Sequence, residues 1–106
     1  MDQRQQARWE ARAQVLKSLA HPSRLMIVDE LSRGARCVAE LREIIGCDMS
    51  TVSRHLAVLK NAGLLADQRQ GVQVFYFLKT PCVLDFFECV ESVLANNVQE
   101  KIYLAR

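Results

Sequence analysis

The segment of residues 48–65 constrains the fold of this chain more than any other part of it. Val52, Leu56 and Leu59 follow one another at intervals of four and three residues, which places them on one face of a helix. Asp48 is suited to cap the start of this helix. The first two turns also carry small hydroxyl side chains and an arginine, namely Ser50, Thr51, Ser53 and Arg54. We therefore expect a helix that buries one face and presents hydrogen-bonding groups on the other.

A helix of this kind suits the major groove of DNA, where its first turns meet base edges and phosphates. The formal net charge of the chain is only +2, so composition alone does not predict a nucleic-acid partner. The distribution of charge is more informative, because residues 49–79 carry Arg54, Lys60, Arg69 and Lys79 against Asp67 alone. Positive charge therefore gathers around the expected helix, as binding to phosphates requires.

The bulk properties favour one soluble domain spanning residues 1–106. Half of the residues are apolar and a quarter are charged, which is typical of a globular chain with one core. No segment is apolar enough to span a bilayer, and the first twenty residues lack the apolar stretch of a signal peptide. We expect a cytoplasmic protein without a membrane partner. We also expect no enzyme, since no phosphate loop, dinucleotide-binding glycine pattern or catalytic triad pattern is present.

The remaining sequence predicts a mainly α (α+β) winged helix-turn-helix with five helices and a two-stranded hairpin. Residues 3–19 read as an amphipathic helix, with Ala7, Ala11, Val15 and Leu19 as its seam. Pro22 opens a second helix to about residue 33, which we expect to bury Leu25, Ile27 or Val28, and Leu31. Residues 37–45 form the third, with Val38, Leu41, Ile44 and Ile45 inward, and residues 37–62 form the helix-turn-helix. The last helix covers residues 81–104.

A change of period from 3.6 to 2 marks the wing at residues 64–78. Two strands flank Gln70-Gly71, which we expect to form the tight turn. Arg69 and Gln73 lie near the tip and are expected to reach phosphates. The first and last helices, residues 1–19 and 81–104, keep apolar faces larger than this core needs. We expect a homodimer through these helices, which would pair two reading helices on a palindromic site.

Three motifs resemble the ArsR/SmtB family of metal-sensing repressors, in the family's order and spacing. They are Leu-Ala-His-Pro-Ser-Arg-Leu-Met-Ile-Val at 19–28, the segment 50–65, and Gln-Gly-Val-Gln-Val-Phe-Tyr-Phe-Leu at 70–78. The resemblance implies a dimeric repressor that leaves its operator DNA when an inducer binds, with no cofactor required for DNA binding. It also implies that Ser50, Thr51, Ser53 and His55 face DNA.

The inducer site departs from the family's best-known forms. Arsenic repressors of this type often carry Cys-Val-Cys where this chain has Cys37-Val38-Ala39, and the last helix lacks the histidines of the family's zinc site. Cys82 and Cys89 lie on that helix, with Cys82 at its positive end, where a thiolate is favoured. We expect Cys82 and Cys89, with Cys37 as their partner, to bind a thiophilic ion such as arsenite.

Two alternatives remain open. Cys82 and Cys89 are seven residues apart, which is about 10.5 Å along a helix, whereas the Cα atoms of a disulfide lie within about 7 Å. Each cysteine therefore needs a partner elsewhere, and a bridge of that kind would make the chain a redox or reactive-sulfur sensor. A protein-interaction module built on a winged helix is the alternative of another class. Packing alone also accounts for buried cysteines in many proteins.

Overall fold

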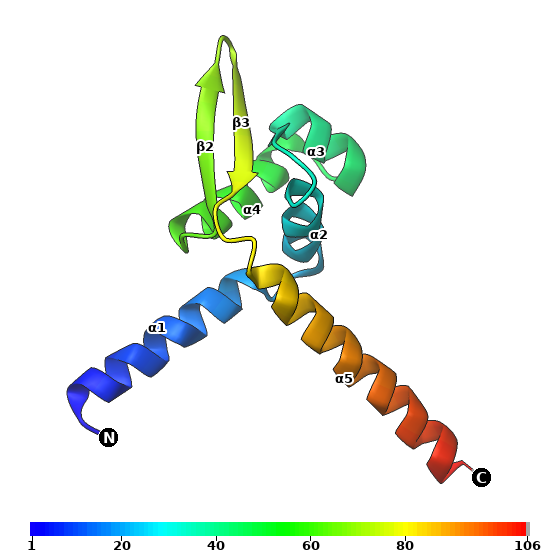
Figure 1. Cartoon of the computed structure of the whole chain (residues 1–106). Coiled ribbons are helices and arrows are strands. Elements are labelled where there is room, and N and C mark those ends of the chain that lie inside the picture. The colour runs from blue at the N-terminus through cyan, green and yellow to red at the C-terminus, as the bar shows by residue number, and fades with distance from the viewer. Residues whose placement is uncertain (106) are drawn as a thin grey trace.

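The computed structural model describes residues 1–105 and confirms the winged helix-turn-helix. The elements follow in the order α1 (Gln3–Leu19), α2 (Pro22–Leu31), β1 (Arg36–Cys37), α3 (Val38–Ile45), α4 (Met49–Asn61), β2 (Leu65–Gln70), β3 (Gln73–Leu78) and α5 (Val83–Leu104). Figure 1 shows α2, α3 and α4 gathered at the foot of the β2–β3 hairpin, while α1 and α5 diverge from this centre. The DNA-binding elements therefore share one small core.

That core is formed where α2, α3 and α4 meet. Its buried members are Leu19, Ile27, Val28, Leu31, Leu41, Val52, Leu56, Leu59, Leu64 and Leu65. Two predicted core residues are wrong, since Leu25 is 40% exposed and Ile44 is 44% exposed. Leu25 lies on the side of α2 that faces a cleft toward α5. On α3, Val38, Leu41 and Ile45 share one face, and Ile44 falls at its edge.

The sheet has three strands and not the two that were predicted. β1 pairs antiparallel with β3 through Arg36 opposite Tyr76 and Cys37 opposite Phe75. A strand of two residues carries no periodic signal, so only tertiary pairing reveals it. The tight turn is also displaced by one residue, because Gln70 pairs with Gln73 and the turn falls on Gly71 and Val72. Gly71 has a φ of 64°, a conformation that glycine adopts without strain, and Val72 is 96% exposed.

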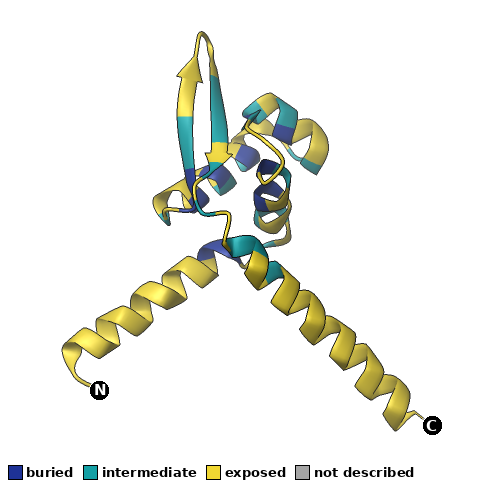
Figure 2. Cartoon of the chain, viewed as in Figure 1, coloured by how far each residue is buried: buried dark blue, intermediate teal, exposed yellow. Residues whose placement is uncertain are grey.

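α1 and α5 are long helices that the rest of the chain hardly covers. Figure 2 shows both as exposed over most of their length. Of the predicted α1 seam only Leu19 is buried, and α5 contains no buried residue. Large apolar side chains of α5 stay exposed: Phe86, Val90, Val93, Leu94, Val98 and Ile102. Among residues 1–105, no helix combines the length and apolar character needed to cross a membrane.

Candidate nucleic-acid interface

The start of α4 is held by Asp48. The Thr51 backbone N–H donates to Asp48 Oδ1 at 2.8 Å, and the Ser50 hydroxyl donates to the same oxygen at 2.9 Å. These bonds, with the backbone N–H as the largest cause, lower the pKa of Asp48 from 3.8 to about 2. A charged cap at the positive end of the helix fixes the orientation of its first turn.

The two faces of α4 differ as the sequence predicts. Val52, Leu56 and Leu59 are fully buried against α2, α3 and β2. Ser50, Ser53 and Arg54 are exposed on the outer side, and Thr51 is partly exposed beside them. Arg54 Nη2 donates to Thr51 Oγ1 at 3.4 Å and has no acidic partner among the ion pairs of residues 1–105. Four of the predicted contact residues therefore form one hydrogen-bonding face.

His55 has a different environment from these four residues. Its ring lies against the ring of His21, with centroids 4.4 Å apart and planes inclined by 45°. Burial is the largest cause that lowers the pKa of His55, and the nearby His21 adds to it. His21 in turn caps α2, because its Nδ1 accepts the Ser23 backbone N–H at 3.0 Å. His55 thus joins α4 to the start of α2.

Lys60 is engaged by an acidic side chain at the far end of α4. Lys60 Nζ lies 2.9 Å from Asp67 Oδ2, at the base of the wing. The hydrogen bond to Asp67 is the largest cause that raises the pKa of Lys60. This ion pair neutralises part of the positive charge counted in the sequence and ties α4 to β2. Lys60 is consequently less available to a phosphate than Arg54.

The wing carries the remaining predicted contacts. Arg69 lies opposite Val74, one step from the closing pair of Gln70 and Gln73. Arg69, Gln70 and Gln73 are all exposed near the tip. The hairpin projects away from the helical core (Figure 1). Its tip therefore presents one cation and two amides to whatever lies beside α4.

Sequence reasoning missed Arg24, which lies on α2 near the contact between the two histidines. Arg24 is partly buried, and its Nε has no hydrogen-bond partner among the described residues. Its positive charge contributes to the lowered pKa of His55. Arg24 stands in the 19–28 motif, but the motif does not show that Arg24 lies near His55, because that position depends on the packing of α2 against α4.

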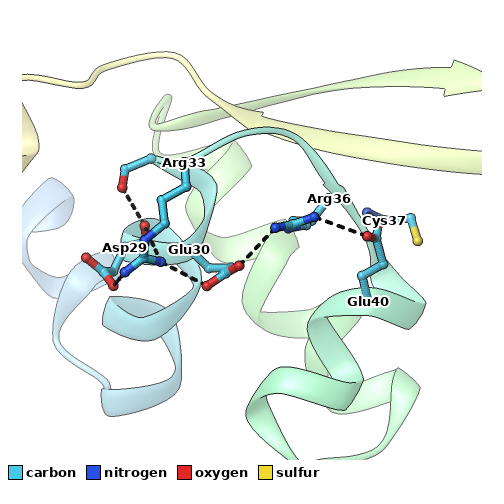
Figure 3. Close-up of polar contacts among 7 residues, drawn as sticks. Asp29, Glu30, Arg33, Arg36, Cys37 and Glu40 are labelled. Atoms are coloured by element: carbon cyan, nitrogen blue, oxygen red, sulfur yellow. Dashed lines mark hydrogen bonds and ion pairs between the residues drawn. The ribbon is translucent and has the colours of Figure 1, made fainter.

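Cys37 occupies a buried position at the start of α3. It is 5% exposed, and its backbone N–H donates to Glu40 Oε1 at 3.1 Å, which is the main cause that lowers the pKa of Glu40. Figure 3 shows the ion pairs beside it, in which Arg36 lies between Glu30 and Glu40 at 3.4 and 3.3 Å. Cys37 therefore belongs to a packed junction of α2, β1 and α3.

Cys82 and Cys89 occupy the opposite kind of environment. Both are exposed, Cys82 immediately before α5 and Cys89 two turns later. Phe86 and Val93 stand three residues before and four residues after Cys89, so they share its face of the helix. Within residues 1–105, no three His, Cys, Asp or Glu side chains are close enough to hold a metal ion together. One protomer does not bring the three predicted sensor cysteines into one site.

Comparison with known proteins supports the same class. A family model for a helix-turn-helix domain matches residues 19–68. The HTH-type transcriptional regulator Rv0081 of Mycobacterium tuberculosis is 30% identical over 95 residues, covering 89% of this chain and 83% of that protein. Its crystal structure has a TM-score of 0.77 over 89% of this chain and 95% of that chain. The likeness therefore extends over nearly the whole fold.

Two further relatives carry more specific descriptions. The homodimeric winged helix-turn-helix DNA-binding domain of Mb0332 from Mycobacterium bovis, a possible ArsR-family regulator, is 32% identical with a TM-score of 0.77, over 90% of this chain and 88% of that chain. The HTH-type transcriptional repressor SmtB of Mycobacterium tuberculosis is 39% identical over 69 residues, or 65% of this chain and 51% of that protein. The chain belongs to the ArsR/SmtB family of winged helix-turn-helix transcriptional regulators.

Proposed function

We propose that this chain is a homodimeric transcriptional repressor that binds palindromic double-stranded operator DNA through α4 and the wing. The observation that carries this proposal is the division of α4 into two faces. Its buried face anchors the helix, whereas Ser50, Ser53 and Arg54 are exposed beside the capped N-terminus. N-terminal residues of a recognition helix are those that reach base edges in the major groove. Arg69 and Gln73 would contact phosphates beside that groove.

The proposed dimer rests on the uncovered helices. Apolar side chains of α1, α2 and α5 line a cleft that the described residues leave open, among them Leu16, Leu25 and Phe86. Exposed apolar surface of this extent usually marks an interface. The homodimeric state of the Mb0332 domain and the description of SmtB as a repressor support the assembly and the direction of regulation.

The finer proposal concerns the inducer. Cys82 and Cys89 are the exposed thiols of α5, and Cys89 stands between Phe86 and Val93 on one face. If that face meets the partner subunit, thiols of two chains approach each other there. Ligation of arsenite or another thiophilic ion would then move α5, and with it the spacing of the two reading helices. Cys37, which is buried, would join this site only after a local rearrangement.

A redox or reactive-sulfur signal is the second candidate, favoured by the exposure of both α5 thiols. Within one helix these two thiols cannot form a disulfide, because about 10.5 Å of helix rise separates them. This distance does not prevent a disulfide between the two subunits or a longer polysulfide bridge. Either bridge would use the same face of α5 as the metal site.

DNA binding is the first test. We would measure the affinity of the reduced protein for a duplex from its own promoter region by fluorescence anisotropy, comparing Arg54→Gln with Arg33→Gln as a matched control. Arg33 lies just after α2, outside α4, and is already paired with Asp29 at 2.8 Å and Glu30 at 2.9 Å. We expect Arg54→Gln to weaken binding at least tenfold, as the loss of a bidentate base contact does. No binding by the folded wild type would favour an interaction module instead.

The inducer is tested on the preformed complex. We would add arsenite, antimonite, copper(I), peroxide and polysulfide in turn, and compare the wild type with Cys82→Ser, Cys89→Ser and Cys37→Ser. The metal sensor is supported if a metal species releases the wild type from DNA and if Cys82→Ser and Cys89→Ser each abolish this release. Release by peroxide or polysulfide alone supports the redox reading. A complex that none of these agents dissociates contradicts the cysteine-sensor proposal.

A further inference from the structure

A group of basic side chains lies where the first turn of α2 meets the middle of α4. We call His21, Arg24, Arg54 and His55 the α2–α4 cluster. The contact between His21 and His55, at 4.4 Å between ring centroids, fixes the position of the two helices at this point. Arg24 lies three residues after His21, on the same side of α2, and Arg54 precedes His55 on α4. The cluster thus joins α2 to the outer face of α4.

The cluster has little acidic compensation. The ion pairs among residues 1–105 involve Arg33, Arg36 and Lys60, and none of them includes Arg24 or Arg54. The charge of Arg54 acts on Asp48, but the Asp48 carboxylate already accepts from Thr51 and Ser50. Concentrated positive charge without acidic partners attracts anions.

Arg24 has a further unmet requirement. Its Nε is buried and has no hydrogen-bond partner among the described residues. None of the side-chain hydrogen bonds or ion pairs among residues 1–105 includes the Arg24 guanidinium, so its remaining donors stay available to an anion. Arginine is also the side chain best suited to a phosphate, because its planar donors match two phosphate oxygens.

The position of the α2–α4 cluster indicates that the anion is a phosphate of DNA. An α-helix is about 10–12 Å wide and nearly fills a major groove about 12 Å across. Groups on an element packed beside the inserted helix therefore lie near the phosphates at the edge of the groove. The wing joins the far end of α4 through Lys60 and Asp67, whereas the cluster joins its middle through His55. The two contacts are thus separate along the helix.

We propose that Arg24 binds a backbone phosphate of DNA at the edge of the groove that α4 enters, with His21 and His55 positioning α2 for this contact. The site lies outside α4 and the wing and extends the interface to a third element. This inference rests on the proposed function, since it requires that α4 enters DNA. It assigns Arg24 to affinity and not to sequence discrimination, because a phosphate carries no base identity.

The salt dependence of binding tests this assignment. Each neutralised phosphate contributes about −0.9 to the slope of log K against log salt. We expect Arg24→Gln to make the slope less steep by about 0.9 and to weaken binding roughly eightfold in 0.1 M salt. The loss should be equal for the promoter duplex and for an unrelated duplex. Arg33→Gln, just beyond the other end of α2, should leave the slope unchanged.

A second measurement changes the DNA and uses Arg24→Met beside Arg24→Gln, in case one of the two variants does not fold. Single phosphates of the duplex are replaced by neutral methylphosphonates, and wild-type affinity is measured for each position. The Arg24 phosphate is the position at which neutralisation weakens the wild type but not Arg24→Met or Arg24→Gln. An unchanged salt slope in a folded Arg24 variant overturns the inference. So does a result in which every phosphate substitution weakens the Arg24 variants as much as it weakens the wild type. Absence of any DNA binding by the wild type instead overturns the proposed function itself.

Discussion

The packing of Leu56 makes the strongest quantitative prediction. Leu56 is fully buried in the centre of α4, between Val52 and Leu59. Leu56→Ala removes three carbon atoms, which is worth about 2.4 kcal/mol of transfer free energy at about 0.8 kcal/mol for each group. The cavity left in a close-packed core raises the expected loss to about 3–4 kcal/mol. Domains of this size are stable by about 5–15 kcal/mol, so a large fraction of the stability is lost.

The assay is urea denaturation followed by circular dichroism, at one fixed protein concentration because dimerisation adds to stability. In thermal melts the same loss corresponds to a decrease of about 12–30 °C. Val58→Ala is the matched control, since Val58 lies on the same helix and is 37% exposed. We expect it to cost less than about 1 kcal/mol. An equal loss for both variants would refute the view that the Leu56 face anchors α4.

Three further predictions concern charged and titratable groups. The pKa of Asp48 is lowered to about 2, so its charge stabilises the fold above its ordinary pKa of 3.8, and this contribution disappears as the pH falls toward 2. Urea midpoints of the wild type and Asp48→Asn should therefore converge between pH 5 and 2; a constant difference contradicts this. The pKa of His55 is lowered from 6.5, so stability should decrease as the pH falls through 6.5. The urea midpoint of His55→Gln should vary less than that of the wild type between pH 7.5 and 5. Equal variation in the two proteins would contradict this. Finally, Lys60→Gln should weaken DNA binding less than Arg54→Gln in anisotropy titrations, because Asp67 already holds Lys60; an equal loss would show that the ion pair opens on DNA.

Local signals in the sequence were sufficient for most of the fold. The spacing of Val52, Leu56 and Leu59 predicted the buried face of α4, and Asp48 predicted its start, because both depend on residues within one or two turns. The alternating pattern likewise predicted the wing. Its turn was misplaced by one residue because both Gln70-Gly71 and Gly71-Val72 contain the glycine that such a turn requires.

Contacts between distant segments of the chain could not be predicted from local sequence patterns. The pairing of β1 with β3 and the exposure of Leu25 depend on how separate elements meet, so no local pattern contains them. The same is true of the position of Arg24 near His55, which the 19–28 motif contains no sign of. Only the packing of α2 on α4 places it beside the exposed face.

The sequence by itself determined the local structure of this protein: the helices with their caps, the hairpin and the hydroxyl-rich face of α4. These features follow from short-range periodicity and hydrogen bonding. The tertiary structure decided which charges remain free, because His55 lies against His21 and Lys60 is paired with Asp67. It also separated the buried Cys37 from the exposed Cys82 and Cys89. Whether a side chain is free to bind a partner depends on its neighbours in space, and those neighbours come from elements far apart in the chain.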